Sequence, residues 1–296
     1  MGADQHRISC AFCGASDFRH VFGKEHFCVK CRKCGIVTSE LIPSDETLID
    51  YYHSYPSYEN LSDLTLVRYN EILDKLEPFR KTNNLVEAGC GFGFFLEVAA
   101  KRNWNVYGTE LSISALNECR RKGLHVIESP ELLLGEYEDK FDAIVSLEVI
   151  EHLSDPFYEA GIYSRLARPG GALYITTPNF NALSRIVLNS RWNVIQYPEH
   201  IYYFTLQTIR KVLYRNGFVK IKEDTLGFSH ARLLYALKKT RGDKTVKDYN
   251  YNEKDRELRD AIEKTVILRI IKKIINTLLT TFNAGDTLKI LYRKNE

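Results

Sequence analysis

The stretch that decides the fold is Leu85-Val-Glu-Ala-Gly-Cys-Gly-Phe-Gly-Phe-Phe95. It runs from a short apolar strand through three alternating glycines, Gly89, Gly91 and Gly93, into the start of a helix. Glycines at such positions let the backbone turn sharply, and they let a ligand lie against the main chain at the carboxyl end of a strand. The stretch therefore predicts the floor of a nucleoside-binding site.

An acidic side chain just before these glycines narrows the class of ligand. A glycine loop and the following helix N-terminus hold the pyrophosphate in dinucleotide sites, and a carboxylate such as Glu87 would be out of place there. A ligand that carries positive charge and no phosphate fits better. A second acid, Glu110, ends the next predicted strand, 104–109.

Strands and helices alternate through most of the chain. Further strands are predicted at 124–128, 141–147, 172–177, 218–224 and 286–292. Helices are predicted at 61–79, at 112–122 with Ser112 as cap and Gly123 as stop, at 155–167 and at 205–216, with a turn at 168–171. Such alternation gives an α/β fold: an open, mostly parallel sheet with helices on both faces, similar to the Rossmann fold.

Composition excludes several classes of protein. With 296 residues, 44% hydrophobic and 27% charged, the chain suffices for one large domain and a small appendage. A net charge of +3 is too weak to argue for nucleic acid. We find no signal peptide at the N-terminus and no run of about 18 uncharged apolar residues, so we expect no transmembrane segment and a cytoplasmic protein.

Residues 1–41 hold five of the seven cysteines. Two Cys-x-x-Cys pairs have the spacing of a zinc ribbon, in which four thiolates complete a tetrahedron. The predicted ligands are the pairs that a glycine follows directly: Cys10, Cys13, Cys31 and Cys34. Cys28 is the spare cysteine and competes with Cys31. We expect the metal to be structural, since so short a segment needs it to fold.

The next segment, 42–60, is rich in Tyr, Ser and Pro. It is either a lid over a ligand or a linker with aromatic anchors, and both interpretations stay open. Its aromatic side chains surround His53 and Pro56: Tyr51, Tyr52, Tyr55 and Tyr58. The main domain is predicted at 61–296, with a helical insertion at 230–282.

A long helix ends this insertion at Phe282. Its apolar residues recur every four positions, with neighbours that widen the stripe: Ile262, Val266, Ile267, Ile270, Ile271, Ile274, Ile275, Leu278 and Leu279. The opposite face is basic, with Arg269, Lys272 and Lys273. The apolar face can pack on the sheet, form a homodimer through 262–282, or lie on a membrane surface.

Four motifs in this order resemble the class I S-adenosylmethionine-dependent methyltransferases: Val-Glu-Ala-Gly-Cys-Gly-Phe-Gly at 86–93, the acid Glu110, Ser-Leu-Glu-Val-Ile-Glu-His-Leu at 146–153, and Arg-Pro-Gly-Gly at 168–171. The resemblance runs from about residue 60 to the end. With its zinc-binding head, the chain resembles bacterial methyltransferases that act on sugars or other small molecules in surface-polysaccharide and secondary-metabolite pathways. It implies a seven-stranded sheet with an antiparallel last strand.

The resemblance also implies S-adenosylmethionine as the cofactor and assigns roles around it. The backbone from Gly89 to Gly93 approaches the methionine moiety, Glu87 lies near its amino end, and Glu110 accepts hydrogen bonds from both ribose hydroxyls. Two acids suit a cationic sulfonium compound with a free diol. The remaining predicted cofactor contacts are Leu111, Leu147 and Glu148. Adenine contacts carry over only weakly, because 128–130 lacks the family's acidic residue followed by a small apolar one.

Methyl transfer to a hydroxyl requires alignment and removal of a proton, and histidine is the usual acceptor near neutral pH. The predicted catalytic residues are His152 and His200. Alternatively, the same region binds a second metal ion, a divalent cation. Its ligands would be two carboxylates and two imidazoles: Glu148, Glu151, His152 and His200. Similar sets occur in small-RNA 2'-O-methyltransferases and ubiquinone-pathway O-methyltransferases. Without such a metal, Glu148 faces the cofactor and Glu151 caps the turn.

The leading hypothesis is O-methylation of a sugar, a nucleotide sugar or a related small hydroxylated molecule. Stacking surface for a ring would come from Trp192, Tyr202, Tyr203 and the tyrosines at 51–58. The alternatives are sugar C-methylation, RNA 2'-O-methylation, and a non-catalytic zinc-ribbon binding module on a methyltransferase scaffold. The near-neutral net charge argues against RNA 2'-O-methylation. The intact glycines argue against a non-catalytic binding module.

Overall fold

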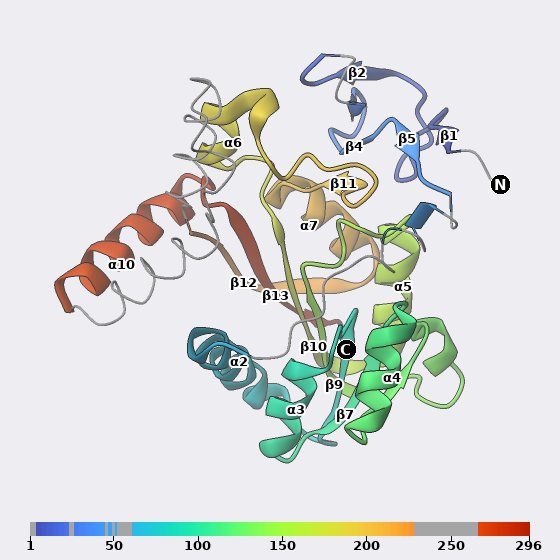
Figure 1. Cartoon of the computed structure of the whole chain (residues 1–296), viewed down its shortest axis with the longest axis vertical. Helices are drawn as coiled ribbons and strands as arrows, with labels where there is room; N and C mark the ends of the chain where they lie inside the picture. The colour runs from blue at the N-terminus through green and yellow to red at the C-terminus, as the bar shows by residue number, and fades with distance from the viewer. Residues whose placement is uncertain (1–3, 24–26, 45–46, 49–50, 52–60, 228–265) are drawn as a thin grey trace.

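The protein folds around a seven-stranded sheet in the order β12-β13-β10-β9-β6-β7-β8 (Figure 1). The computed structural model describes residues 4–23, 27–44, 47–48, 51, 61–227 and 266–296. The strands are β6 (Asn84–Ala88), β7 (Asn105–Thr109), β8 (His125–Ile127), β9 (Phe141–Leu147), β10 (Ala167–Pro178), β12 (Phe218–Leu226) and β13 (Thr287–Lys294). The pairs among β6 to β10 are parallel, while β13 runs antiparallel between β10 and β12. The predicted mostly parallel sheet with an antiparallel last strand is confirmed.

Helices cover both faces of the sheet. They are α2 (Asp63–Leu76), α3 (Phe94–Lys101), α4 (Ile113–Arg121), α5 (Pro156–Leu166), α6 (Leu183–Leu188), α7 (Leu206–Arg215) and α10 (Val266–Thr281), with 3-10 helices η2 (Glu77–Phe79), η3 (Pro130–Leu133) and η4 (Asn189–Arg191). Successive strand residues point to opposite faces. Val86 and Ile144 accordingly join one core with α5 and α7, whereas Leu85 and Val145 join another with α2, α3 and α4.

Side-chain caps begin several helices where the sequence places Ser, Asp or Thr. Ser62 accepts a hydrogen bond from the Thr65 N–H at α2, and Asp155 accepts two at the start of α5. Thr205 forms a capping box at α7. Ser112 stands at the N-cap of α4 as predicted, but its side chain makes no capping hydrogen bond.

The predicted turn at 168–171 is wrong, because these residues lie inside strand β10. The register of β10 against β9 shifts between Ala167 and Ala172, so the Pro-Gly-Gly run forms a bulge in the strand rather than a turn before it. A long-range contact holds it there: Arg168 Nε donates to Asp142 Oδ1 at 2.5 Å, in the core.

The N-terminal segment forms small sheets that connect to the main domain. Its strands are β1 (Gln5–His6), β2 (Phe18–His20), β3 (Cys28–Cys31), β4 (Val37–Ser39) and β5 (Leu41–Ile42). The order of the larger sheet is β11-β4-β3-β2, in which β11 (Tyr202–Tyr203) comes from the main domain. In Figure 1 this segment, in blue, lies beside β11 and α7. A strand from far along the chain therefore completes the predicted ribbon.

Helix α10 is the described part of the predicted insertion; residues 230–265 lie outside the described residues. Leu279 is buried, and Thr280 bonds to Thr225 of β12. The other apolar side chains described on or just after α10 are exposed: Ile270, Ile271, Ile274, Ile275, Leu278 and Phe282. Packing of the whole apolar face on the sheet is thus wrong for this part, and the homodimer stays a prediction. No described helix is long and apolar enough to cross a membrane.

Candidate active site

The three glycines after β6 all have left-handed backbone angles, with φ of +66° at Gly89, +52° at Gly91 and +76° at Gly93. A Cβ at Gly89 would lie 2.5 Å from Val149 Cγ2, and one at Gly93 would lie 2.5 Å from Leu124 Cδ1. A Cβ at Gly91 would meet no described atom within 4 Å. Gly89 and Gly93 therefore permit close packing of the protein on itself, while Gly91 faces open space.

Glu110 follows β7 and holds the glycine loop. Its Oε2 accepts a hydrogen bond from the Gly91 N–H at 2.9 Å, and its Oε1 accepts one from the Ser112 N–H at 2.8 Å. Each oxygen keeps a further lone pair, so the carboxylate can still accept two hydroxyl donors. The neighbouring Leu111 side chain is 68% exposed. The edge thus offers a pair of acceptors beside an apolar surface, which fits a ribose and a base.

Glu87 lies in strand β6 and is only 4% exposed. Among the described residues no hydrogen-bond partner reaches its Oε2. Burial, and then the neighbouring Cys119 and Glu110, raise the pKa of this carboxyl group well above its ordinary value. A buried acid with an unused oxygen fits a ligand that brings its own ammonium group, as S-adenosylmethionine does.

Beyond the carboxyl end of β9, three side chains form a Glu-His-His cluster: Glu151, His152 and His200. One ligand atom from each lies within 4.8 Å of the others. Glu151 is 2% exposed, and neither of its carboxylate oxygens has a hydrogen-bond partner among the described residues. Burial, and then Glu148, raise its pKa well above the ordinary value. Such a carboxylate needs a cation or a hydrogen-bond donor from a ligand.

Backbone carbonyls fix the tautomer of both imidazoles. His152 Nδ1 lies 2.8 Å from the Glu199 carbonyl oxygen, and His200 Nδ1 lies 2.6 Å from that of Val194. A carbonyl oxygen only accepts, so each Nδ1 carries the hydrogen and Nε2 of the neutral ring keeps its lone pair. Burial, and then His200, lower the pKa of His152 to about 4. A neutral imidazole with an unprotonated Nε2 can bind a metal or accept a proton.

Comparison with known proteins decides the family. A family model described as a methyltransferase domain matches residues 63–223, which is more than half of the chain. The chain belongs to this methyltransferase family. The resemblance to the class I S-adenosylmethionine-dependent methyltransferases is thereby confirmed, and the fold agrees with it.

Individual relatives are more distant. A ubiquinone biosynthesis O-methyltransferase of Methylococcus capsulatus is 35% identical over 101 residues, which cover 32% of this chain and 43% of the relative. That of Pseudomonas paraeruginosa is 30% identical over 134 residues, covering 42% and 56%. The methyltransferase thus spans about half the length of these relatives. A crystal structure of a SAM-dependent methyltransferase from Archaeoglobus fulgidus has the same fold, with a TM-score of 0.52, 16% identity and coverage of 85% and 100%.

Of the predicted set of four metal ligands, Glu151, His152 and His200 have ligand atoms within 4.8 Å of one another, and Glu148 is outside that group. Its φ of +55° is left-handed, and its N–H donates to the Thr176 carbonyl oxygen at 3.0 Å. This bend at the end of β9 leaves the Glu148 side chain exposed, whereas Glu151, three residues later, is buried. Leu147, before the bend, is half-buried. Cofactor contacts from Leu147 and Glu148 stay predictions.

The predicted stacking surface is wrong for three aromatic residues. Trp192, Tyr202 and Tyr203 are buried in the protein's own core. Tyr202 packs edge-on against Phe157, and Tyr203 lies against Phe180. Because these rings are buried among other side chains, they offer no exposed stacking surface to an acceptor.

One residue near the cluster, Glu199, was not predicted from the sequence. Tyr51 donates a hydrogen bond to Glu199 Oε2 at 2.7 Å, and Glu199 also supplies the carbonyl that orients His152. The only signal for Glu199 was its position beside His200 in Pro-Glu-His. Tyr51 thus brings part of the 42–60 segment to the active site; the other tyrosines of that segment, with His53 and Pro56, lie outside the described residues.

In the segment considered for adenine contacts, 128–130, Glu128 and Ser129 make contacts within the protein. The Glu128 carboxylate pairs with Arg120, at 3.0 Å between Oε1 and Nη2, and lies at the surface. Ser129 caps η3 by accepting from the Glu131 N–H. An adenine role for these side chains therefore has no support in their geometry.

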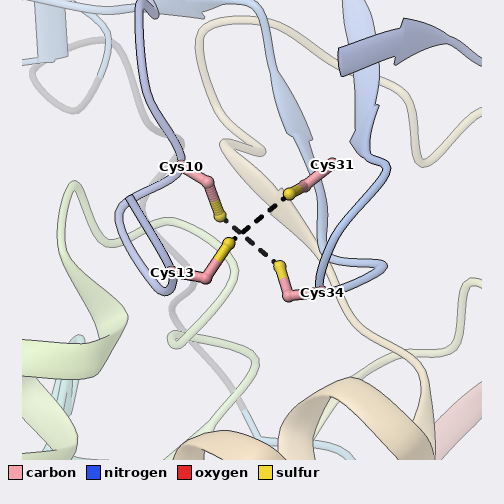
Figure 2. Close-up of side chains that lie close together, drawn as sticks. All are labelled: Cys10, Cys13, Cys31 and Cys34. Atoms are coloured by element: carbon pink, nitrogen blue, oxygen red, sulfur yellow. Dashed lines mark hydrogen bonds between the residues drawn. The ribbon is translucent and has the colours of Figure 1, made fainter. Parts of the chain in front are cut away.

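The four ribbon cysteines converge on one centre (Figure 2). Sγ of Cys10 lies 3.5 Å from that of Cys34, and Sγ of Cys13 lies 3.6 Å from that of Cys31. A zinc–sulfur bond of about 2.3 Å gives tetrahedral sulfurs separated by about 3.8 Å, so the four thiols fit zinc. Cys28, three residues before Cys31 on β3, points to the opposite face of that strand. It is buried beside Trp192 and Tyr203, and burial raises its pKa to about 12. Cys28 is therefore a core residue.

Proposed function

We propose that this protein transfers a methyl group from S-adenosylmethionine to a hydroxyl oxygen of a small molecule held at the Glu-His-His cluster. One observation carries the proposal. A buried carboxyl group, Glu151, has neither oxygen hydrogen-bonded among the described residues, and it lies beside the imidazoles of His152 and His200, with His152 Nε2 3.7 Å from Glu151 Oε1. A site with one carboxyl group and two imidazoles beyond the carboxyl ends of the parallel strands fits removal of a hydroxyl proton.

The cofactor supplies an electrophilic methyl group on a sulfonium sulfur. Glu87 would bind its ammonium group, Glu110 would accept from the ribose hydroxyls, and the open backbone at Gly91 would leave room beside both. Attack then requires the acceptor oxygen to lie in line with the carbon–sulfur bond. His152 or His200 accepts the hydroxyl proton at Nε2 and holds it there.

The Glu-His-His cluster also fits a divalent cation, because one carboxylate and two imidazole nitrogens form a common donor set for transition metals. Such a cation would supply Lewis acidity that favours loss of the hydroxyl proton. Glu151 and the two Nε2 atoms would hold it, and the carbonyls of Glu199 and Val194 would keep both rings in orientation.

For the acceptor, we propose a molecule with neighbouring hydroxyls, with a sugar or nucleotide sugar of surface-polysaccharide pathways as the first candidate. A catechol is the second candidate, which is favoured by the names of the ubiquinone biosynthesis O-methyltransferases. Both classes present two adjacent oxygens to the cluster. A screen with labelled cofactor against nucleotide sugars, free sugars and catechols separates the two.

Substitution of the cluster tests the reaction. We expect His152→Ala and His200→Ala each to lower kcat by at least about 100-fold, since the proton acceptor is lost. The affinity for S-adenosylhomocysteine, measured by calorimetry, should change less than about twofold in both. His6→Ala, an exposed histidine in β1, is the matched control. Normal turnover in both cluster variants would exclude the base and metal roles together.

A further inference from the structure

The segment that carries His200 lies between the ribbon and the Glu151 turn. On one side, β11 pairs with β4 of the ribbon, with Tyr202 opposite Thr38 and Tyr203 opposite Val37. On the other side, the N–H groups of Ile201 and Tyr202 both donate to the Glu151 carbonyl oxygen at 2.9 Å. The Ile201–Tyr202 peptide, one residue after His200, therefore lies between the ribbon strand β4 and the Glu151 carbonyl of the Glu-His-His cluster.

The side chain of Thr38 joins the ribbon strand β4 to the segment that follows His200. Its Oγ1 donates to the Ile201 carbonyl oxygen at 2.9 Å, and the next N–H, that of Ser39, donates to the same oxygen at 2.7 Å. Thr38 is only 2% exposed and Ile201 is fully buried. A buried carbonyl with two donors from one strand has little freedom to tilt, so Thr38 fixes the plane of the Ile201–Tyr202 peptide, one residue after His200.

The zinc site fixes β4 in turn. Cys34 precedes Thr38 by four residues, and the Cys31 N–H donates to the Ile36 carbonyl oxygen at 2.9 Å between them. Lys211 of α7 donates to the Cys34 carbonyl oxygen at 2.7 Å, which ties this knuckle to the main domain. Zinc held by the four thiolates would therefore keep β4 in place against β11.

We propose that the zinc ribbon is a positioning element of the active site, and that Thr38 acts through the Ile201 peptide to hold His200 against Glu151. Its catalytic consequence rests on the proposed function of the Glu-His-His cluster. Thr38 touches neither acceptor nor cofactor in this role. The ribbon thus orients one of the cluster's imidazoles as well as folding around its own metal.

Thr38→Val tests the proposal, since it removes the hydroxyl and keeps the shape. We expect the affinity of the zinc-loaded protein for Mn²⁺, measured by calorimetry, to fall about tenfold, as for other residues that orient metal ligands. The value of kcat should fall about as much, with KM for the cofactor unchanged. Thr38→Ser, which keeps the hydroxyl, should restore both. Thr47→Val is the matched control, because the Thr47 hydroxyl donates to Asp4 and not to Ile201.

Hydrogen exchange gives a second readout that does not depend on turnover or on Mn²⁺. We expect the amides of Ile201 and Tyr202 to exchange about tenfold faster in Thr38→Val than in Thr47→Val, with equal zinc content and equal protection of β6 and β9. Equal exchange in the two variants would overturn the positioning role, whatever the cluster does. If exchange is faster in Thr38→Val, but the wild-type protein binds no Mn²⁺ on titration and methylates no acceptor, the ribbon contact is supported and the proposed function is overturned.

Discussion

Buried carboxyl groups have different surroundings at the two ends of the parallel strands, called here the amino edge and the carboxyl edge of the sheet. At the amino edge, Asp142 uses both oxygens: Oδ1 accepts from Arg168, and Oδ2 accepts the three N–H groups of residues 81–83 at 2.6 to 2.8 Å. Burial raises the pKa of Asp142, but Arg168 and these N–H groups outweigh it, so the pKa lies below its ordinary value.

At the carboxyl edge, Glu87 and Glu151 are equally buried, but the described residues leave oxygens of both without partners. The pKa of each is raised well above its ordinary value, chiefly by burial. One chain thus satisfies a buried acid completely at one edge and leaves two unsatisfied at the other. The buried acid at the amino edge therefore stabilises the fold. The buried acids at the carboxyl edge need a ligand that brings positive charge or hydrogen-bond donors.

The largest effect we expect comes from Asp142→Asn. The change leaves the Arg168 guanidinium buried without its carboxylate, which destabilises the protein by about 3–5 kcal/mol. Denaturant unfolding at pH 7 measures the loss. In the wild type, the stability due to Asp142 is present above the unfolded pKa near 4 and is lost as the pH falls through the lower folded pKa.

Asp74→Asn is the matched control for this change. Asp74 also pairs with an arginine, Arg102, at 2.8 Å, but its side chain is 69% exposed. An exposed pair contributes little, so we expect a loss of no more than about 0.5 kcal/mol. If Asp142→Asn were as mild as this control, the amino edge would not stabilise the fold in the way described.

The contrast between the edges also explains what the sequence could predict. The alternation of apolar strands and helices is local, and it was enough to predict a mostly parallel sheet with helices on both faces. The antiparallel last strand was expected from the resemblance to the methyltransferases. Arg168-Pro-Gly-Gly was predicted as a turn because its composition is that of a turn. Its true place inside β10 depends on Asp142, 26 residues earlier, and no local pattern shows that contact.

The candidate site shows the same limit. The motifs supplied the identities of Glu87, Glu110, His152 and His200, because the residue types are tied to the ends of strands. Which side chains meet was less visible: Glu148 is outside the group of close ligand atoms, and Tyr202 is a buried core residue. Both outcomes depend on packing between segments far apart in the chain.

The pKa of Glu159 on α5 lies between the lowered pKa of Asp142 and the strongly raised pKa values of Glu87 and Glu151. Burial raises the pKa of its carboxyl group to about 7. The folded protein therefore binds a proton that the unfolded chain releases near pH 4.5, so stability is full below that pH and falls as the pH rises to 7. We expect wild type to lose about 2 kcal/mol more than Glu159→Gln between pH 5 and pH 8. Urea unfolding at both pH values decides, and parallel pH profiles would contradict a raised pKa.

The smallest effect, and the sharpest test of the carboxyl edge, is Glu87→Gln. If the ammonium group of S-adenosylhomocysteine ionises Glu87 on binding, wild type releases a proton, and its affinity rises as the pH rises toward the raised pKa of Glu87. We expect Glu87→Gln to release no proton and to bind about tenfold more weakly at pH 8, a loss of about 1.4 kcal/mol. Calorimetry in buffers of different ionisation enthalpy measures both quantities. Glu118→Gln, a surface acid paired with Arg121, should behave as wild type; proton release that persists in Glu87→Gln would place the ammonium group elsewhere.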